Sequence, residues 1–153
     1  MAAYMPVIIG VADVKNKTSE LKEPATLMLE AILQAIDDSR VPDQELRSLI
    51  DDIEVVRTWT WPYLDLPGLL AQKLGLATSP RWTQYTRHGG DQPAKLVDEA
   101  AGRIARGEAR VAVVTGGEAL ASRESGDLPS HLLLFLFFVS VIILHPRQQI
   151  KNI

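Results

Sequence analysis

The sequence predicts an α/β domain in which a mixed, mostly parallel sheet carries helices on its faces. Two observations predict it. Short apolar runs rich in β-branched residues alternate along the chain with longer stretches whose apolar residues recur at helical spacing. The chain has 153 residues, 46% of them hydrophobic, which is enough for one domain with a buried core. The alternation ends near residue 122, where an atypical apolar tail begins.

Four strands are expected. The first, which opens Pro6-Val7-Ile8-Ile9-Gly10, is a nearly continuous apolar run of the kind found in strands covered on both faces. The others are short and are bounded by turn residues or by helical stretches. The expected strands lie near residues 6–12, 52–57, 82–86 and 110–115.

Helices are expected between these strands. Pro24 and Pro93 lie in the first turns of two of them, where proline is tolerated, and Asp43 is placed to cap a third. Gly75 and Gly107 follow the last helical residues, as C-terminal glycines do. Right-handed crossovers then place the helices on the faces of the sheet. The expected helices span residues 24–36, 43–49, 69–74 and 92–106.

The tail differs from the rest of the chain. Phe135, Phe137 and Phe138 are its only phenylalanines, and in the run Leu132–Leu144 only Ser140 is polar. We therefore divide the chain into a domain at 1–122 and an atypical hydrophobic tail at 123–153. Three interpretations of the tail stay open: a segment foreign to the fold, such as the product of a frameshift or a translated intron, a buried strand or helix, or a membrane anchor.

Composition excludes several classes of function. The net charge of −3 gives no basic surface for nucleic acid. The absence of cysteine removes disulfides, thiolate metal sites and a cysteine nucleophile. The acidic residues Asp51, Asp52 and Glu54 lack metal-ligand spacing and are expected to be the solvated start of a strand, so no metal site is expected. No targeting segment is seen, and the cytoplasm is the expected location.

The turn His88-Gly89-Gly90-Asp91 joins the end of a strand to the start of a helix. Ligands of α/β folds bind outside the carboxyl ends of strands, and a helix N-terminus offers N–H groups and a partial positive charge. Two interpretations are open: a ligand approaches the glycine backbone, or the glycines only make a steep turn and Asp91 only caps the helix. His88 is either a base or a solvent-facing or structurally bonded histidine.

Two further features follow other strands. Gly116 and Gly117 come after the fourth strand, where we expect them to pack close to the neighbouring glycine turn; they lack the spacing of a dinucleotide or P-loop motif. Trp59, Trp61 and Tyr63 alternate after the second strand, so in extended backbone they share one face. They either line a pocket or interface, or cover an edge of the core.

Three stretches carry a family resemblance. The strand that opens at Pro6 precedes a long helix, and residues 49–57 lead through an aspartate and an isoleucine into a strand. The most specific stretch runs from the turn at Gly89 through a helix ending Ala-Arg-Gly-Glu-Ala at 105–109 to the strand and Gly-Gly-Glu at 111–118. On these residues the stretch 5–122 resembles the N-terminal half of the thiolase superfamily, closest to acetyl-CoA acetyltransferase-like and sterol-carrier-protein-type thiolases.

The resemblance implies a five-layered enzyme of two similar halves, an acyl-CoA substrate and a homodimer. In that family the helix begins beside the acyl-accepting cysteine, and counting back from Gly107 and Glu118 places that position at Gly90. This chain looks like superfamily members that carry a Gly-Gly turn there. Its match covers the first half only, so the catalytic histidine and second cysteine of the other half have no counterpart, and neither do the loops that usually hold CoA.

Two functions are therefore expected as alternatives, and whether the chain is an enzyme stays open. The first is a thiolase-like acyl-CoA acyltransferase of lipid metabolism, here a truncated copy without its nucleophilic cysteine and inactive alone. The second is a non-catalytic acyl-CoA-binding or interaction module, membrane-associated through 132–144 if the tail is an anchor, although a membrane partner is not favoured. By family the peroxisome is the alternative location, though no peroxisomal signal is seen.

The expected site has no catalytic residue and no cofactor besides acyl-CoA as substrate. Its expected substrate-binding residues are His88, Gly89, Gly90, Asp91, Gly116 and Gly117.

Overall fold

The computed structural model describes residues 4–15, 22–59, 61–118 and 139–146. Its strands and helices alternate in the order that the sequence predicts, with one further strand near the C-terminus. The elements are β1 (Pro6–Val14), α1 (Pro24–Asp38), α2 (Asp43–Leu49), β2 (Ile50–Val55), α3 (Leu66–Lys73), β3 (Trp82–Tyr85), α4 (Gln92–Ala105), β4 (Val111–Gly117) and β5 (Val139–Pro146).

The strands form one five-stranded sheet in the order β1-β5-β4-β2-β3. β2 is parallel to both β3 and β4, whereas β5 is antiparallel to both of its neighbours, β1 and β4. β1 to β4 therefore all run in one direction and β5 runs in the other. This arrangement confirms the mixed, mostly parallel sheet that the sequence predicts.

β5 lies inside the sheet, although it comes from the apolar tail. Its backbone pairs with β1 from Pro6 opposite Pro146 to Val14 opposite Val139, and with β4 from Ala112 to Gly117. Residues 139–144, the second part of the apolar run, therefore form a strand inside the sheet. The boundary at residue 122, residues 123–138 and residues 147–153 lie outside this observation, and the division of the chain there stays a prediction.

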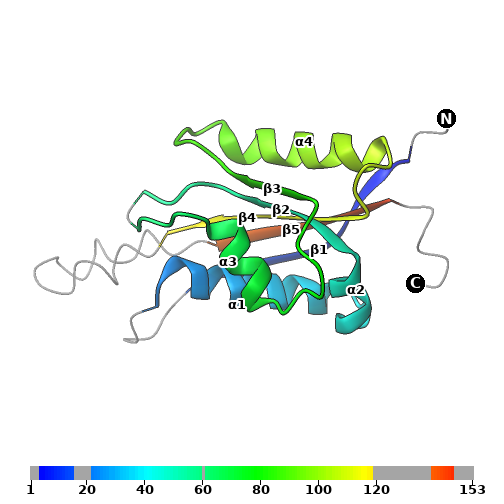
Figure 1. The fold of residues 1–153 in the computed structure, drawn as a ribbon, viewed down its shortest axis with the longest axis horizontal. Helices are drawn as coiled ribbons and strands as arrows, with labels where there is room; N and C mark the ends of the chain where they lie inside the picture. The colour runs from blue at the N-terminus through cyan, green and yellow to red at the C-terminus, as the bar shows by residue number, and fades with distance from the viewer. Residues whose placement is uncertain (1–3, 16–21, 60, 119–138, 147–153) are drawn as a thin grey trace, which may run out of the picture.

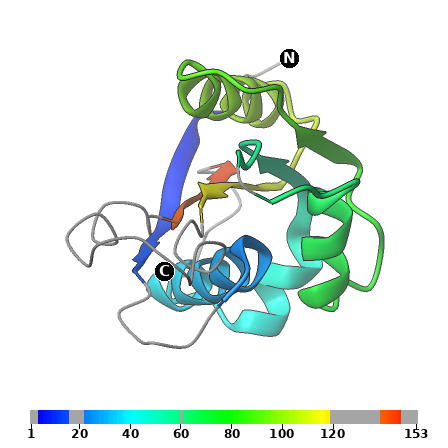
Figure 2. The same cartoon turned by 90° about the vertical axis from the view of Figure 1, so that its left-hand side faces the viewer.

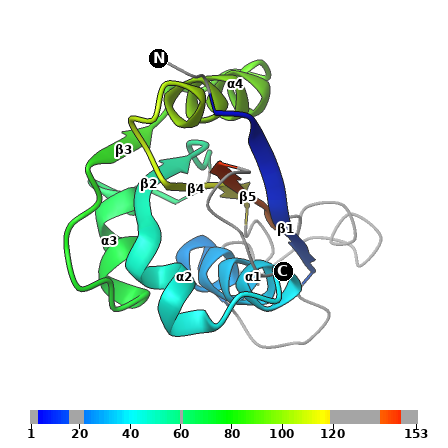
Figure 3. The ribbon, with the colours of Figure 1, turned by 90° about the vertical axis from the view of Figure 1, so that its right-hand side faces the viewer.

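Helices cover both faces of the sheet, so the domain has three layers (Figures 1 and 2). α1, α2 and α3 lie on one face and α4 lies alone on the other. β1 forms one edge of the sheet and spans from the α4 side to the α1 side (Figure 3). β3 forms the opposite edge.

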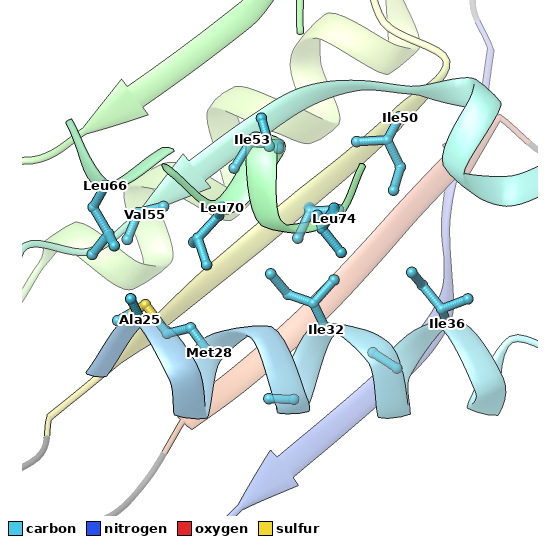
Figure 4. Close-up of a cluster of buried hydrophobic side chains, with 14 of the residues drawn as sticks. Ala25, Met28, Ile32, Ile36, Ile50, Ile53, Val55, Leu66, Leu70 and Leu74 are labelled. Carbon is cyan, nitrogen blue, oxygen red and sulfur yellow. The ribbon is translucent and has the colours of Figure 1, made fainter. Parts of the chain in front are cut away.

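The larger core lies between the sheet and the pair α1 and α3 (Figure 4). Met28, Ile32 and Ile36 recur at helical spacing along α1 and are fully or almost fully buried. Such apolar side chains are each worth about 1.5–3 kcal/mol when removed from water, so this face holds α1 on the sheet. The facing residues are Ile50, Ile53 and Val55 from β2 and Leu66, Leu70 and Leu74 from α3 and the residue that follows it.

α1 approaches β1 so closely that one strand position has no room for a side chain. A Cβ atom built on Gly10 would lie 2.1 Å from the backbone oxygen of Ala35. Gly10 itself is buried, and the strand pairing shifts register between Ile8 and Gly10. The glycine in the first apolar run is therefore required by helix packing.

The second core lies under α4. Leu96, Ala100 and Ile104 are fully buried, and they pack with Ala112 and Val114 of β4. The buried residues recur at helical spacing, and Val97 and Ala101 beside them are partly buried. Gly107 follows α4 with φ +72°, which confirms its predicted place after the last helical residue.

Some helix starts differ from the prediction. α3 begins at Leu66 rather than Leu69, because the carboxylate of Asp65 accepts a hydrogen bond of 2.9 Å from Gly68 N and caps the helix. The prediction that Asp43 caps α2 is wrong: Pro42 occupies the cap position and makes no side-chain bond. Asp43 is instead the first helical residue and pairs with Arg47 one turn later.

Candidate functional site

The carboxyl ends of the parallel strands β2, β3 and β4 lie next to each other at the same end of the sheet. The backbone N–H of Val56 donates to the carbonyl oxygen of Thr115 over 2.8 Å. The backbone N–H of Arg57 donates to Oγ1 of Thr86 over 3.0 Å, and the N–H of Thr86 donates to the carbonyl of Val55 over 3.1 Å. The three segments that follow these strands are therefore fixed next to each other, in the place where α/β folds bind ligands.

The turn from His88 to Asp91 leads from β3 into α4, as the sequence predicts. Neither Gly89 nor Gly90 has a positive φ, so the backbone of the turn does not itself require glycine. A Cβ atom on Gly90 would meet no atom of the described residues within 4 Å, whereas one on Gly89 would lie 2.6 Å from the Asp91 carboxylate. The turn therefore presents open space at position 90.

The alternative that Asp91 caps α4 is wrong. Asp91 stands at the cap position, but its side chain makes no cap hydrogen bond. Its carboxylate instead accepts a 3.0 Å bond from Nε2 of the buried Gln92, and this bond lowers the pKa of Asp91. The N-terminal turn of α4 is left without a side-chain cap, so its positive end faces the turn directly.

His88 is stacked on Trp59. The two ring centroids lie 4.0 Å apart with an angle of 27° between the planes. The imidazole is exposed and makes no hydrogen bond or ion pair within the described part of the chain. Because a general base needs a group that orients its ring and a proton to take, this placement favours the solvent-facing interpretation of His88 over the base.

Gly116 lies against β2 rather than against the glycine turn. β2 separates β4 from β3 in the sheet, so the turn before α4 is not the neighbour of Gly116 that the sequence led us to expect. A Cβ on Gly116 would lie 2.8 Å from Cβ of Val56, which explains the glycine by close packing. Gly117 ends β4 and pairs with Val139. Their role in binding stays a prediction.

The link between the ends of β3 and β4 is made by Trp59. Its indole stacks on His88, while its backbone N–H donates to Oε1 of Glu118, directly after β4. Trp59 comes from the loop after β2, between the two other strand ends. The alternating aromatic spacing points to Trp59 in the sequence, but it does not predict this link.

The three alternating aromatic residues line a pocket of about 670 Å³ beside the turn. The side chain of Tyr63 is held in place by two hydrogen bonds of its hydroxyl. The hydroxyl accepts from the N–H of Ala25 and donates to the carboxylate of Glu23 over 3.1 Å. Burial raises the pKa of this phenol well above its usual value. The three aromatic residues therefore line a pocket, and Tyr63 also covers an edge of the larger core. The lining residues are Arg57, Thr58, Trp59, Trp61, Pro62, Tyr63, Leu64, Tyr85 and His88.

The expectation that the acidic cluster on β2 is solvated is wrong. Asp52 and Glu54 are 0% and 1% exposed, and both contact the guanidinium of Arg103 on α4. Only Asp51 is partly exposed, where it pairs with Arg110 over 3.0 Å. A signal for this was present, because Arg103 lies one turn beyond Ala100 on the apolar stripe of α4.

The described residues hold no group of three or more histidine, aspartate or glutamate side chains placed to bind a metal ion. In the same part of the chain, no helix has the length and apolar character needed to cross a membrane.

The fold is thiolase-like, as the comparison with solved structures shows. A monomeric SCP2-thiolase-like protein from Mycobacterium smegmatis aligns over 96% of this chain with a TM-score of 0.72 and 15% identity. The priming β-ketosynthase of the R1128 polyketide pathway aligns over 94% with a TM-score of 0.68 and 15% identity. A cysteine-to-serine variant of Xanthomonas campestris OleA, with bound lauric acid and lauroyl-CoA, aligns over 99% with a TM-score of 0.75 and 12% identity.

The chain spans about half the length of these proteins, namely 46%, 51% and 59%. At such low identity the likeness establishes the fold, and it confirms the resemblance read from the sequence. No protein-family model and no curated protein sequence matches the chain.

Proposed function

We propose that this chain is a thiolase-like acyl-CoA acyltransferase by descent that binds an acyl thioester without forming an acyl-enzyme. Its binding site is the turn His88–Asp91 at the N-terminus of α4. The observation that carries the proposal is the open space at Gly90, at the start of an uncapped helix, in a chain with no cysteine. The thiolase-like fold supports an acyl-CoA substrate, since the aligned OleA structure holds lauroyl-CoA.

The chemistry follows from what the turn offers. A thioester carbonyl placed at the helix N-terminus would lie at the positive end of the helix dipole. The donor of the first turn is the backbone N–H of Ala94, because that of Gln92 is bonded to Gly89 and Pro93 has none. Transfer of the acyl group needs a thiolate nucleophile, and glycine has none. We therefore expect these 153 residues to bind an acyl-CoA of the acetyl-CoA acetyltransferase type without turnover. We further propose that it acts in the cytosol and needs no cofactor besides the acyl-CoA itself.

The test measures binding and turnover separately. Isothermal titration of acetyl-CoA and acetoacetyl-CoA should show binding to the wild-type chain, while a thiolysis assay should show no product. Gly90→Leu should abolish binding by filling the open space. Ala77→Leu is the matched control and should bind like the wild type, because Ala77 is exposed in the loop before β3, at the opposite end of that strand from the turn.

A cysteine restored at this position tests the mechanism further. Gly90→Cys should fold normally, because nothing lies within 4 Å of its Cβ. It should remain inactive, since His88 makes no hydrogen bond within the described residues that would orient it as a base for the new thiol. Turnover by the wild type would contradict both the assignment of Gly90 and the inactive state. Equal acyl-CoA binding by Gly90→Leu and wild type would refute the site.

A second candidate function is an interaction module, and one observation favours it. Three apolar side chains at the edge strand β1 are exposed to solvent. Ile8 and Val11 on the strand are 57% and 52% exposed, and Met5 just before it is 59% exposed. Such a group of exposed apolar side chains is typical of an interaction surface. We propose that they bring two copies of the chain together. Light scattering of the wild type and of Ile8→Ser tests this: the wild type should associate and the variant should shift toward monomer.

A further inference from the structure

The pocket beside the turn contains a guanidinium that has no carboxylate partner among the described residues. Arg57 follows β2, is half-buried, and its Cζ lies 4.6 Å from the centre of the Tyr85 ring. Within the described residues, no carboxylate or carbonyl accepts a hydrogen bond from its side chain. Four other arginines are paired with carboxylates: Arg47, Arg103, Arg106 and Arg110. Arg40, Arg81 and Arg87 make no ion pair within the described residues either, but they do not line this pocket.

A guanidinium in this setting favours an anion. It carries five N–H donors in a planar fork that matches the two oxygens of a carboxylate or phosphate. One face of the guanidinium packs on the ring of Tyr85. Because the guanidinium is partly buried, it attracts a negative group more strongly than it would in water. Since the chain itself supplies no such group in the described region, the donors are available to a ligand.

The walls of the pocket are fixed by hydrogen bonds before any ligand arrives. Oγ1 of Thr58 donates to the carbonyl of Trp61 over 2.7 Å and lies 3.1 Å from the hydroxyl of Tyr85. Tyr63 is anchored to Glu23, as described above. Because these side chains are already fixed, less conformational entropy is lost when a ligand binds.

We infer that this pocket binds an organic anion, that is, a carboxylate or phosphate ester carried on a flat or apolar body. Arg57 pairs with the anionic oxygens, and the rings of Trp61, Tyr63 and Tyr85 contact the body. The volume of about 670 Å³ is in the range of small-molecule sites. The site adjoins the turn through His88, yet its ligand does not depend on the acyl-CoA proposal.

Three matched probes test the inference on the wild-type chain. Phenylacetate and phenyl phosphate carry the two anionic groups, and phenylacetamide is neutral with nearly the same shape. In a titration followed by tryptophan fluorescence, the anions should bind about 10-fold more tightly than the amide, as expected for a charged hydrogen-bonded pair. Tighter binding of phenyl phosphate assigns a phosphate ligand, and tighter binding of phenylacetate assigns a carboxylate.

Variants locate the site. Arg57→Met keeps an apolar stem and should weaken binding of both anions about 10-fold. Arg81→Met is the matched control, because Arg81 also lies near a ring, 5.8 Å from that of Trp82, but outside the pocket. Its binding should equal that of the wild type, and circular dichroism should show both variants folded.

The inference is overturned by equal binding of phenylacetamide and the anions to the wild type, by the absence of any anion binding at millimolar concentration, or by equal losses in the two arginine variants. The first two outcomes need no variant. Anion binding that survives while acyl-CoA binding fails would refute the proposed function and leave this site standing.

Discussion

Arg103 on α4 donates from Nε to Oδ2 of Asp52 on β2 over 2.8 Å, although 51 residues separate them. The same guanidinium contacts Glu54, which lies on the same face of β2. Two buried carboxylates thus share one cation, and an oxygen of each has no partner in the described structure. This cluster joins the sheet to the helix whose N-terminus forms the candidate site.

Removal of the shared cation should destabilise the protein strongly. Arg103→Met would leave two uncompensated carboxylates buried under α4, at a cost of about 3–5 kcal/mol in the free energy of unfolding. Urea denaturation followed by circular dichroism measures the change. Arg106→Met, which breaks an exposed pair with Glu108 on the same helix, is the control and should have little effect. Similar midpoints for the two variants would show that the buried cluster does not hold α4.

Replacement of Asp52 should change how stability depends on pH. Burial raises the pKa of Asp52 above 3.8, and Arg103 offsets this rise only in part. A raised folded-state pKa means that the native state holds the proton more tightly, so the stabilisation is present below pH 3.8 and is lost as the pH rises through the raised pKa.

Asp52→Asn lacks this titration. The free energy of unfolding of the wild type should therefore fall relative to that of Asp52→Asn as the pH rises from about 4 toward neutrality, in denaturation curves taken at each pH. Asp98→Asn, exposed on α4, controls for the loss of one negative charge. Parallel pH profiles for the wild type and Asp52→Asn would disprove the expectation.

Two glycine substitutions should differ in their effect on the free energy of unfolding. Gly10→Ala would place a methyl group 2.1 Å from the Ala35 carbonyl oxygen, so α1 and β1 must separate, at a cost of about 1–3 kcal/mol. Gly90→Ala meets open space and should change stability by less than about 0.5 kcal/mol. Thermal or urea unfolding distinguishes them, and a Gly10→Ala variant as stable as the wild type would argue against the close approach.

The local spacing of apolar residues was sufficient to predict most helices and strands and the position of the candidate site. Apolar residues at helical spacing predicted α1 and α4, and β-branched runs predicted β2 and β4, because these periods bury one face of a helix or both faces of a strand. The turn at His88 was found because it lies between a strand and a helix. The helix caps were predicted less well, since Asp43 and Asp91 each had another hydrogen-bond partner nearby.

Long-range contacts decided the rest. Charge alone suggested that Asp52 and Glu54 face water, yet both are buried because a residue from α4 crosses above them. Likewise, Arg57 packs on the ring of Tyr85 from another strand, and it makes no ion pair within the described residues. Neither contact can be predicted from the spacing of apolar and polar residues in the sequence around it.

By itself, then, the sequence determined the α/β class, the order of its elements, the resemblance to thiolases and the lack of a cysteine nucleophile, because each depends on local spacing or composition. Only the tertiary structure decided that residues 139–146 complete the sheet between β1 and β4, and that β2 separates Gly116 from the glycine turn. Strand order is set by which edges can pair when the helices cover both faces, and this depends on contacts between segments far apart in the chain.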